Sequence, residues 1–187
     1  MKIKLSFIVI VFFTVTALQG QVPDNCVAKV ILSSYSERAY TSEPVTDTQL
    51  ELILECGIKA PSARNLQPWK FTVIKDEGTM REIINDVVPG NVLVVVSGIV
   101  SEEGGTPDFD CGLAAESMFL AAHGLGLGAR IYGSPAGNIN SKQDQFQIPS
   151  GCKAVVVLRI GNIDESVDAV SAATQRKSLQ EVINYKQ

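Results

Sequence analysis

The sequence predicts a single α+β domain in which strands and helices interleave along the chain. Stretches of β-branched residues, of which 92–100 is the longest, alternate with stretches whose apolar residues recur at helical spacing. The 187 residues are 45% hydrophobic and 19% charged, so the chain can bury a substantial core. Because no repeat, low-complexity tract or linker interrupts the pattern, we expect one layered domain.

The N-terminal residues are typical of a secretory signal peptide. Lys2 and Lys4 precede an apolar run from Leu5 to Leu18, which is shorter than the roughly 20 residues that a membrane-spanning helix needs. We therefore predict a signal peptide over residues 1–20 and a mature domain over residues 21–187, exported to the periplasm and free of the membrane. A retained anchor helix is the alternative, and a cytoplasmic location follows if these residues are not a leader.

Charge and cysteine content argue against two classes of function. The chain carries 16 Lys and Arg against 20 Asp and Glu, a net charge of −4 that becomes about −6 without the two leader lysines. Such an acidic chain is not expected to bind nucleic acid. Four cysteines without metal-ligand spacing, and a single histidine, predict no metal site. We interpret the cysteines as buried apolar residues more often than as disulfide partners. They are Cys26, Cys56, Cys111 and Cys152.

Capping residues locate three helix starts. Asp24 can cap a short helix directly after the leader. Thr46 and Gln49 form a capping box, the strongest helix start in the chain, and this helix leads straight to Ala60. Ser178 with Glu181 predicts a short C-terminal helix in the same way. The apolar residues at helical spacing are Val27, Val30 and Ile31 in the first helix and Leu50, Ile53, Leu54 and Gly57 in the second.

The predicted helix over residues 111–125 is apolar nearly all round, so it belongs at the domain centre or in a subunit interface. Asp108 or Asp110 can cap it, and the run Gly124–Gly128 is expected to end it. We interpret His123 as a structural residue, because the sequence fixes no nucleophile or carboxylate beside it. The other predicted elements are strands over 71–74, 92–100 and 154–160, extended residues 131–134 and a helix over about 77–87.

The segment from Ala60 to Phe71 concentrates hydrogen-bond donors between two prolines. Pro61 and Pro68 restrict the backbone on either side. A stiff loop of donors beside Trp69 suits a flat ligand with polar edges, such as a flavin or a nucleotide. The alternative is a turn whose polar side chains bond their own backbone and whose Trp69 fills the core. The donors are Ser62, Arg64, Asn65 and Gln67.

Three blocks of sequence resemble the nitroreductase family of FMN-dependent oxidoreductases, and they occur in family order over nearly the whole mature chain. The resemblance implies a homodimer with a central, mostly antiparallel sheet flanked by helices and one FMN at each of two subunit interfaces. A reduced nicotinamide would reduce the FMN, and a nitroaromatic or quinone-like acceptor would reoxidise it in ping-pong fashion. The blocks are Ala60–Trp69, then Asp110–Glu116 with Leu120–Ala122 and Gly124–Gly128, and finally Leu158–Gly161 with Arg176.

The resemblance also implies which residues hold FMN. Residues 34–38 correspond to the segment that grips FMN near its ribityl phosphate, and Arg176 corresponds to a C-terminal phosphate-binding Arg. Residues 61–67 correspond to the wall that packs on the flavin from the partner subunit. Residues 133–134 would offer main-chain groups to the flavin N5 edge. The implied cofactor-binding residues are Ser34, Tyr35, Ser36, Arg38, Pro61, Ser62, Ala63, Asn65, Gln67, Gly133, Ser134 and Arg176.

The phosphate-binding segment departs from the family pattern. Relatives usually carry Arg where this chain has Ser34, and often a second Arg or His where it has Tyr35. The remaining cations are Arg38, Arg176 and Lys177. Losing one bidentate cation costs about 1.5–3 kcal/mol of FMN binding, so we expect loosely held FMN.

Export would also change the chemistry, because nicotinamide cofactors are cytosolic and an exported protein needs another electron donor. The span from Phe71 to Asp110 is short for the family, which predicts an open active-site channel. No catalytic acid or nucleophile is expected from the protein, because the flavin ring carries the hydride. Two alternatives remain, a flavin-binding module without turnover and a relative with other redox chemistry, such as a dehydrogenase.

Overall fold

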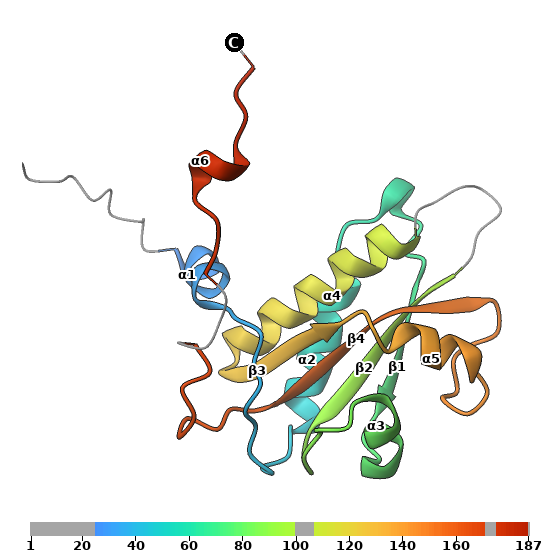
Figure 1. Ribbon diagram of the computed structural model, residues 1–187. Coiled ribbons are helices and arrows are strands. Elements are labelled where there is room, and N and C mark those ends of the chain that lie inside the picture. The colour runs from blue at the N-terminus through green and yellow to red at the C-terminus, as the bar shows by residue number, and fades with distance from the viewer. Residues whose placement is uncertain (1–24, 100–106, 171–174, 187) are drawn as a thin grey trace, which may run out of the picture.

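A computed structural model of the chain describes residues 25–99, 107–170 and 175–186 (Figure 1). The predicted signal peptide, the predicted cap Asp24 and the last residue of the predicted strand, Val100, lie outside the described residues. Within the described part of the chain, no helix is long and apolar enough to span a bilayer.

A four-stranded sheet in the order β1-β2-β4-β3 forms the centre of the domain, and every neighbouring pair is antiparallel. The predicted α+β class with an antiparallel sheet is therefore confirmed. The last strand is longer than predicted, because pairing with β3 carries it through Gly161 to Asn162. The strands are β1 (Trp69–Ile74), β2 (Val92–Ile99), β3 (Leu127–Tyr132) and β4 (Cys152–Asn162).

Helices cover both faces of the sheet. On one face α4 packs on the strands and α2 packs against α4, and on the other face α3 and α5 lie beside the sheet (Figure 1). α6 belongs to a C-terminal tail that extends away from the domain (Figure 1). The helices are α1 (Cys26–Ser33), α2 (Asp47–Ile58), α3 (Glu77–Ile83), α4 (Pro107–Gly124), α5 (Ala136–Ser141) and α6 (Leu179–Val182), with a 3₁₀ turn over Ala63–Asn65.

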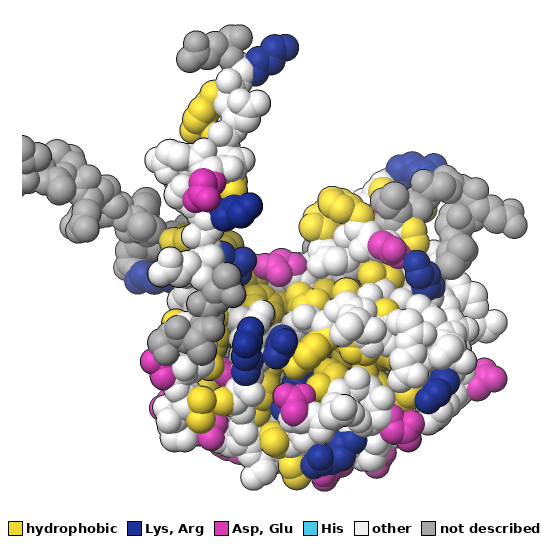
Figure 2. Space-filling model, viewed as in Figure 1, with side chains coloured by type: hydrophobic (Ala, Val, Ile, Leu, Met, Phe, Trp, Pro, Cys, Tyr) yellow, Lys and Arg dark blue, Asp and Glu magenta, His cyan; other side chains and the backbone are white. Residues whose placement is uncertain are grey.

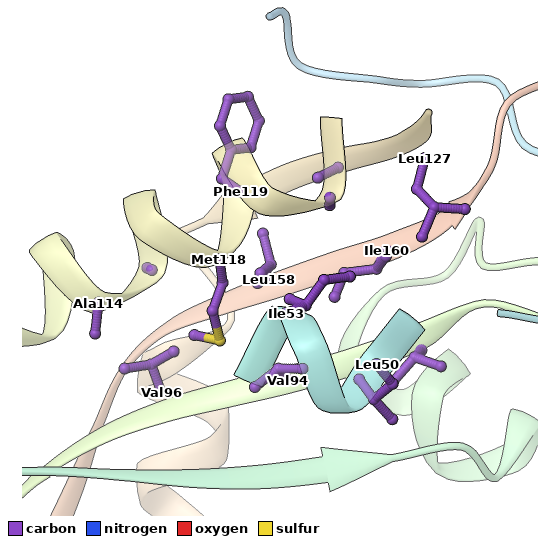
Figure 3. Packing of buried hydrophobic residues seen from close by; sticks show 14 of the residues in the cluster. Leu50, Ile53, Val94, Val96, Ala114, Met118, Phe119, Leu127, Leu158 and Ile160 are labelled. Carbon is purple, nitrogen blue, oxygen red and sulfur yellow. The ribbon is translucent and has the colours of Figure 1, made fainter. Parts of the chain in front are cut away.

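The core has two halves, one on each side of the sheet. Val94 and Val96 of β2 pack toward α2 and α4, where Ile53 and Met118 meet them (Figure 3). Neighbouring β2 residues pack toward α3 and α5. The residues Val92–Ser97 of β2 are all buried, which explains why this strand shows almost no alternation of apolar and polar residues.

Three helix ends differ from the predictions. Asn25 caps α1, because its side-chain oxygen accepts a hydrogen bond from the Ala28 N–H at 3.0 Å. α3 ends at Ile83, since the next residue is already extended. α4 begins at Pro107, whose fixed φ suits a first helical position, so Asp108 and Asp110 lie in the first turn.

The cysteine prediction holds for two residues and fails for one. Cys111 and Cys152 are buried, and burial raises the pKa of the Cys111 thiol to about 12. Cys26 is exposed, because α1 buries none of its residues and lies at the margin of the domain. Cys56 is half-buried. The apolar spacing of α1 therefore does not mark a core face within one chain, where Val27 remains 62% exposed.

Candidate functional site

A cavity of about 460 Å³ between α1, α4 and the C-terminal segment brings together three of the predicted site residues. Ser34 and Ser36 come from the segment after α1, and Arg176 comes from the chain beyond β4. Figure 2 shows apolar side chains gathered over α4 and the strands on this side of the molecule. We call this the α1–α4 cavity. Its other lining residues are Ile31, Leu32, Glu116, Phe119 and Ile131.

A fully buried carboxylate, Glu37, fixes the segment that supplies the two serines. One carboxylate oxygen accepts hydrogen bonds from the backbone N–H groups of Arg38 and Ala39 at 2.7 and 2.9 Å. The other accepts a hydrogen bond from the Tyr35 hydroxyl at 2.7 Å. The Glu37 N–H donates to the Ala129 carbonyl of β3 at 3.1 Å, which ties the segment to the sheet.

Gly128 makes room for this buried carboxylate. A Cβ at Gly128 would lie 2.5 Å from Glu37 Cγ, so only glycine lets the segment approach β3 this closely. The glycine run was predicted to end α4, and Gly126 with φ +76° does so. The sequence did not predict the second role, at Gly128, because it depends on Glu37, which lies 91 positions earlier in the sequence.

Tyr35 and Arg38 do not line the α1–α4 cavity. The Tyr35 hydroxyl is engaged by Glu37, and burial together with this hydrogen bond raises the pKa of Tyr35 to about 12. Arg38 is exposed beside the cavity segment. Lys177 is also exposed and is not among the lining residues. Arg176 is thus the cation that the described chain presents to the cavity.

His123 lies behind the cavity wall between two aromatic rings. Its ring centroid is 4.6 Å from that of Phe119 and 5.6 Å from that of Tyr35. Its Nε2 atom is buried without a hydrogen-bond partner, and burial lowers the pKa of His123. The neutral ring acts as a packing element in this arrangement, in keeping with the structural role expected from the sequence.

We expect the stability of the protein to fall as the pH drops below the ordinary histidine pKa of about 6.5. Burial lowers the pKa of His123 in the folded state, so the unfolded state binds a proton more readily and is stabilised relative to the folded state as the pH falls. His123→Phe should remove this dependence between pH 7 and 5, because the chain has no other histidine. Urea denaturation at several pH values measures it, and equal slopes for both proteins would contradict the expectation.

The segment Ala60–Pro68, called the Pro61 loop from here on, has an unusual backbone. Arg64, Asn65 and Gln67 have φ angles of +52°, +56° and +49°, in the left-handed region that costs non-glycine residues energy. The Ser62 hydroxyl accepts a hydrogen bond from the Gln67 N–H at 3.0 Å. Strained residues of this kind persist only where surrounding contacts hold them, and they cluster at ligand sites.

The Pro61 loop has features of both a structural turn and a ligand-binding loop, the two alternatives that the sequence left open. Trp69 is buried in the core, and the Gln67 side chain donates to the Asn65 carbonyl at 3.3 Å. Both features are those expected of a structural turn. The loop nevertheless remains at the surface, with Ser62 half-buried and its neighbours exposed. It can therefore contact a ligand or a second chain without unfolding.

Asp110 of α4 anchors the Pro61 loop. Its carboxylate is buried, and both oxygens accept the Ala63 N–H at 3.3 Å. The sequence suggested Asp110 only as a helix cap, because its partner lies 47 positions away. A carboxylate in the first turn of α4 is also favoured by the helix dipole.

Asp110→Ala is expected to release the Pro61 loop and to lower the free energy of unfolding by about 1–2 kcal/mol, because it removes a hydrogen bond to a charged acceptor. Trypsin should then cut more rapidly after Arg64, which lies in the loop. Limited proteolysis measures the rate, and Asp110→Asn, which keeps an acceptor oxygen, is the matched control. Equal cleavage rates in all three proteins would show that Asp110 does not hold the loop.

The structure places the predicted site residues in three regions, which are the Pro61 loop, the segments at the α1–α4 cavity and the residues after β3. The Pro61 loop lies at the start of α4, and the α1–α4 cavity lies along its second half, where Phe119 is about 13 Å further along the helix than Asp110. Gly133 follows β3 and is exposed, and a Cβ there would meet nothing within 4 Å. The predicted residues outside the cavity lining are Tyr35, Arg38, Pro61, Ser62, Ala63, Asn65, Gln67, Gly133 and Ser134.

Comparison with known proteins places this arrangement in context. A model of the nitroreductase family matches residues 31–93, which include both the Ser34–Arg38 segment and the Pro61 loop. A protein of Archaeoglobus fulgidus, provisionally named an NADH dehydrogenase/NAD(P)H nitroreductase, is 31% identical over 54% of this chain and 63% of its own length. A protein of Methanothermobacter thermautotrophicus with the same provisional name is 31% identical over 60% of this chain and 63% of its own.

The solved structures match over a longer range. A provisionally named nitroreductase from Desulfovibrio desulfuricans, crystallised in complex with FMN, aligns with 88% of this chain and 98% of its own at 27% identity and a TM-score of 0.75. The fold is therefore that of the nitroreductases, an α+β class with an antiparallel sheet flanked by helices. The resemblance to the nitroreductase family is confirmed. The chain spans 63% of the length of the two curated relatives.

Proposed function

We propose that the protein is an FMN-dependent oxidoreductase of the nitroreductase type. The observation that carries the proposal is the α1–α4 cavity, in which Ser34, Ser36 and Arg176 meet beside apolar side chains. The cavity lies in a fold similar to a structure crystallised with FMN. Hydroxyl groups suit a ribityl chain, a guanidinium suits a phosphate, and apolar walls suit a flavin ring.

Bound FMN would supply the hydride chemistry, and the chain's own residues would bind and orient it. Arg176 would neutralise phosphate charge, while the hydroxyls of Ser34 and Ser36 would bond the polyol. Phe119 and Ile131 would exclude water from the ring. No acid or nucleophile of the chain is needed, because the flavin ring would carry the hydride.

We further propose a homodimer in which the Pro61 loop of one chain completes the α1–α4 cavity of the other. Within one chain the loop and the cavity lie at different places along α4. Apolar side chains that a second copy could cover are exposed on α1, α2 and the C-terminal tail. They include Val27, Ile31, Leu32, Leu52, Ile58, Leu179 and Val182.

The electron donor depends on where the protein is located, whereas the acceptor class is proposed from the resemblance to the nitroreductase family. We propose export, on the basic start and short apolar run at residues 1–20, and a nitroaromatic or quinone-like acceptor. An exported enzyme would take electrons from a donor other than cytosolic nicotinamide. A flavin-binding module without turnover is the second candidate, and it is favoured by the single cation, Arg176, among the described lining residues and by the lack of a nicotinamide donor outside the cytosol.

Reconstitution with FMN tests the proposal. The mature protein should bind FMN and turn yellow, and addition of NADH, NADPH or dithionite should bleach the band. Ser36→Trp should fill the cavity and Ser62→Trp should block the flavin wall, so both should lose colour. Ser141→Trp, at an exposed serine on α5 across the sheet, should bind normally. Bleaching by dithionite alone favours the module or another donor, and a colourless wild type contradicts the proposal.

A further inference from the structure

The α1–α4 cavity is poorly equipped for a doubly charged phosphate. Among the described residues that line it, Arg176 is the cation and Glu116 is the anion, so the two charges offset each other. Two further polar lining residues, Ser34 and Ser36, are neutral. An anion in this cavity therefore meets hydroxyl groups and a balanced pair of charges rather than a cluster of cations.

The surroundings of the cavity are also acidic. Glu37 is fully buried directly behind the serine segment, and its carboxylate is already satisfied by Tyr35, Arg38 and Ala39. The charges of Asp168 and Glu165 reach Tyr35 as well and contribute to its raised pKa. These carboxylates oppose a dianion at this end of the domain, and the two exposed cations of the neighbouring segments, Arg38 and Lys177, do not line the cavity.

The polyol part of a flavin is not subject to the electrostatic repulsion that opposes the phosphate. A ribityl chain is neutral, and the hydroxyls of Ser34 and Ser36 can both donate and accept hydrogen bonds. The isoalloxazine ring needs apolar wall, which Phe119 and Ile131 provide. Most of the binding free energy should therefore come from the part of the cofactor that riboflavin and FMN share.

We infer that this chain gains little affinity from the FMN phosphate and accepts riboflavin at the same site, and that Glu116 is the residue that sets this specificity. The inference rests on the proposed flavin site. An exposed carboxylate facing a partly exposed anion changes affinity about two- to fivefold. Glu116 therefore lowers the affinity for FMN relative to riboflavin, and Arg176 raises it.

Parallel titrations of the mature apoprotein with riboflavin and with FMN, followed by quenching of flavin fluorescence, test the inference. The measured quantity is the ratio of the riboflavin Kd to the FMN Kd. In the wild type we expect a ratio within about tenfold of one, because one exposed cation is balanced by one exposed anion. Glu116→Gln should raise the ratio about two- to fivefold, and Arg176→Gln should lower it by a similar factor.

Glu82→Gln is the matched control. Glu82 lies on α3, across the sheet from the cavity, and its contact with the Gln145 side chain can be kept by a glutamine oxygen. The ratio should not change in this variant. A wild-type ratio well outside this tenfold range, or no shift in Glu116→Gln, overturns the inference while leaving the flavin site intact. Failure of both flavins to bind overturns the proposed function and the inference together.

Discussion

Gly90→Ala is expected to lower the free energy of unfolding by about 3 kcal/mol, the largest loss that we expect from the addition of one methyl group. Gly90 has a φ angle of +83°, and a Cβ there would lie 2.6 Å from the Ser42 carbonyl oxygen and 2.7 Å from that of Glu43. These atoms belong to the backbone and cannot rotate away. Left-handed strain of about 1 kcal/mol and overpacking of about 1–3 kcal/mol add to the expected loss.

Gly151→Ala provides the control for Gly90. Gly151 has nearly the same backbone conformation, with φ +75°, but a Cβ there would meet nothing within 4 Å. Its replacement should cost only the strain, about 1 kcal/mol. Thermal unfolding should place the midpoint of the Gly90 variant about 6–12 °C below wild type, on the usual scaling for a chain of this size. Similar midpoints for the two variants would refute the role of the Ser42 and Glu43 carbonyls.

Arg159→Leu is expected to cost about 3 kcal/mol of stability, because Arg159 is a buried cation at the centre of a network. Its Nε donates to the Asn91 side-chain oxygen at 2.8 Å and its Nη2 to the Asp86 carbonyl at 2.9 Å. The guanidinium also lies 4.1 Å from the centre of the Tyr40 ring. Leucine would leave Asn91, itself buried, with fewer partners.

Arg81→Leu is the comparison for this second variant. Arg81 pairs with Glu77 on the surface of α3, with both side chains about half exposed, and such pairs contribute little. Urea denaturation should show a change of about 0.5 kcal/mol or less. A loss in Arg159→Leu no greater than that of the surface variant would mean that the network does not stabilise the fold. Flavin binding per folded molecule should be unaffected in both, because neither arginine lines the α1–α4 cavity.

Local signals in the sequence predicted much of the fold. The capping box at Thr46 starts α2 as expected, since its partner Gln49 lies within the same turn. The unbroken β-branched run gave β2 almost to the residue. Helix ends were misplaced at Ile83 and Pro107, and strand ends at Trp69, Leu127, Tyr132 and Asn162. The strand ends depend on pairing with neighbouring strands, which the local pattern does not contain.

The parts of the candidate site that depend on distant partners could not be predicted. Glu37 looked like an ordinary charged residue in a polar stretch, and only its approach to β3 through Gly128 makes it a buried anchor. Asp110 and Ala63 form a contact across 47 positions. Arg159 was part of a sequence block typical of the family, yet its contacts with Asn91 and Asp86 give it a structural role.

The distance along α4 between the Pro61 loop and the α1–α4 cavity has a consequence for mixtures of defective chains. If the loop of one chain closes the cavity of its partner, Ser36→Trp spoils the cavity and Ser62→Trp spoils the loop, each leaving the other half intact. Unfolding and refolding the two variants together would create hybrid dimers. Each hybrid would contain one site in which both the cavity and the loop are unaltered. About a quarter of all sites would regain flavin on random pairing, whereas a site built within one chain would regain none.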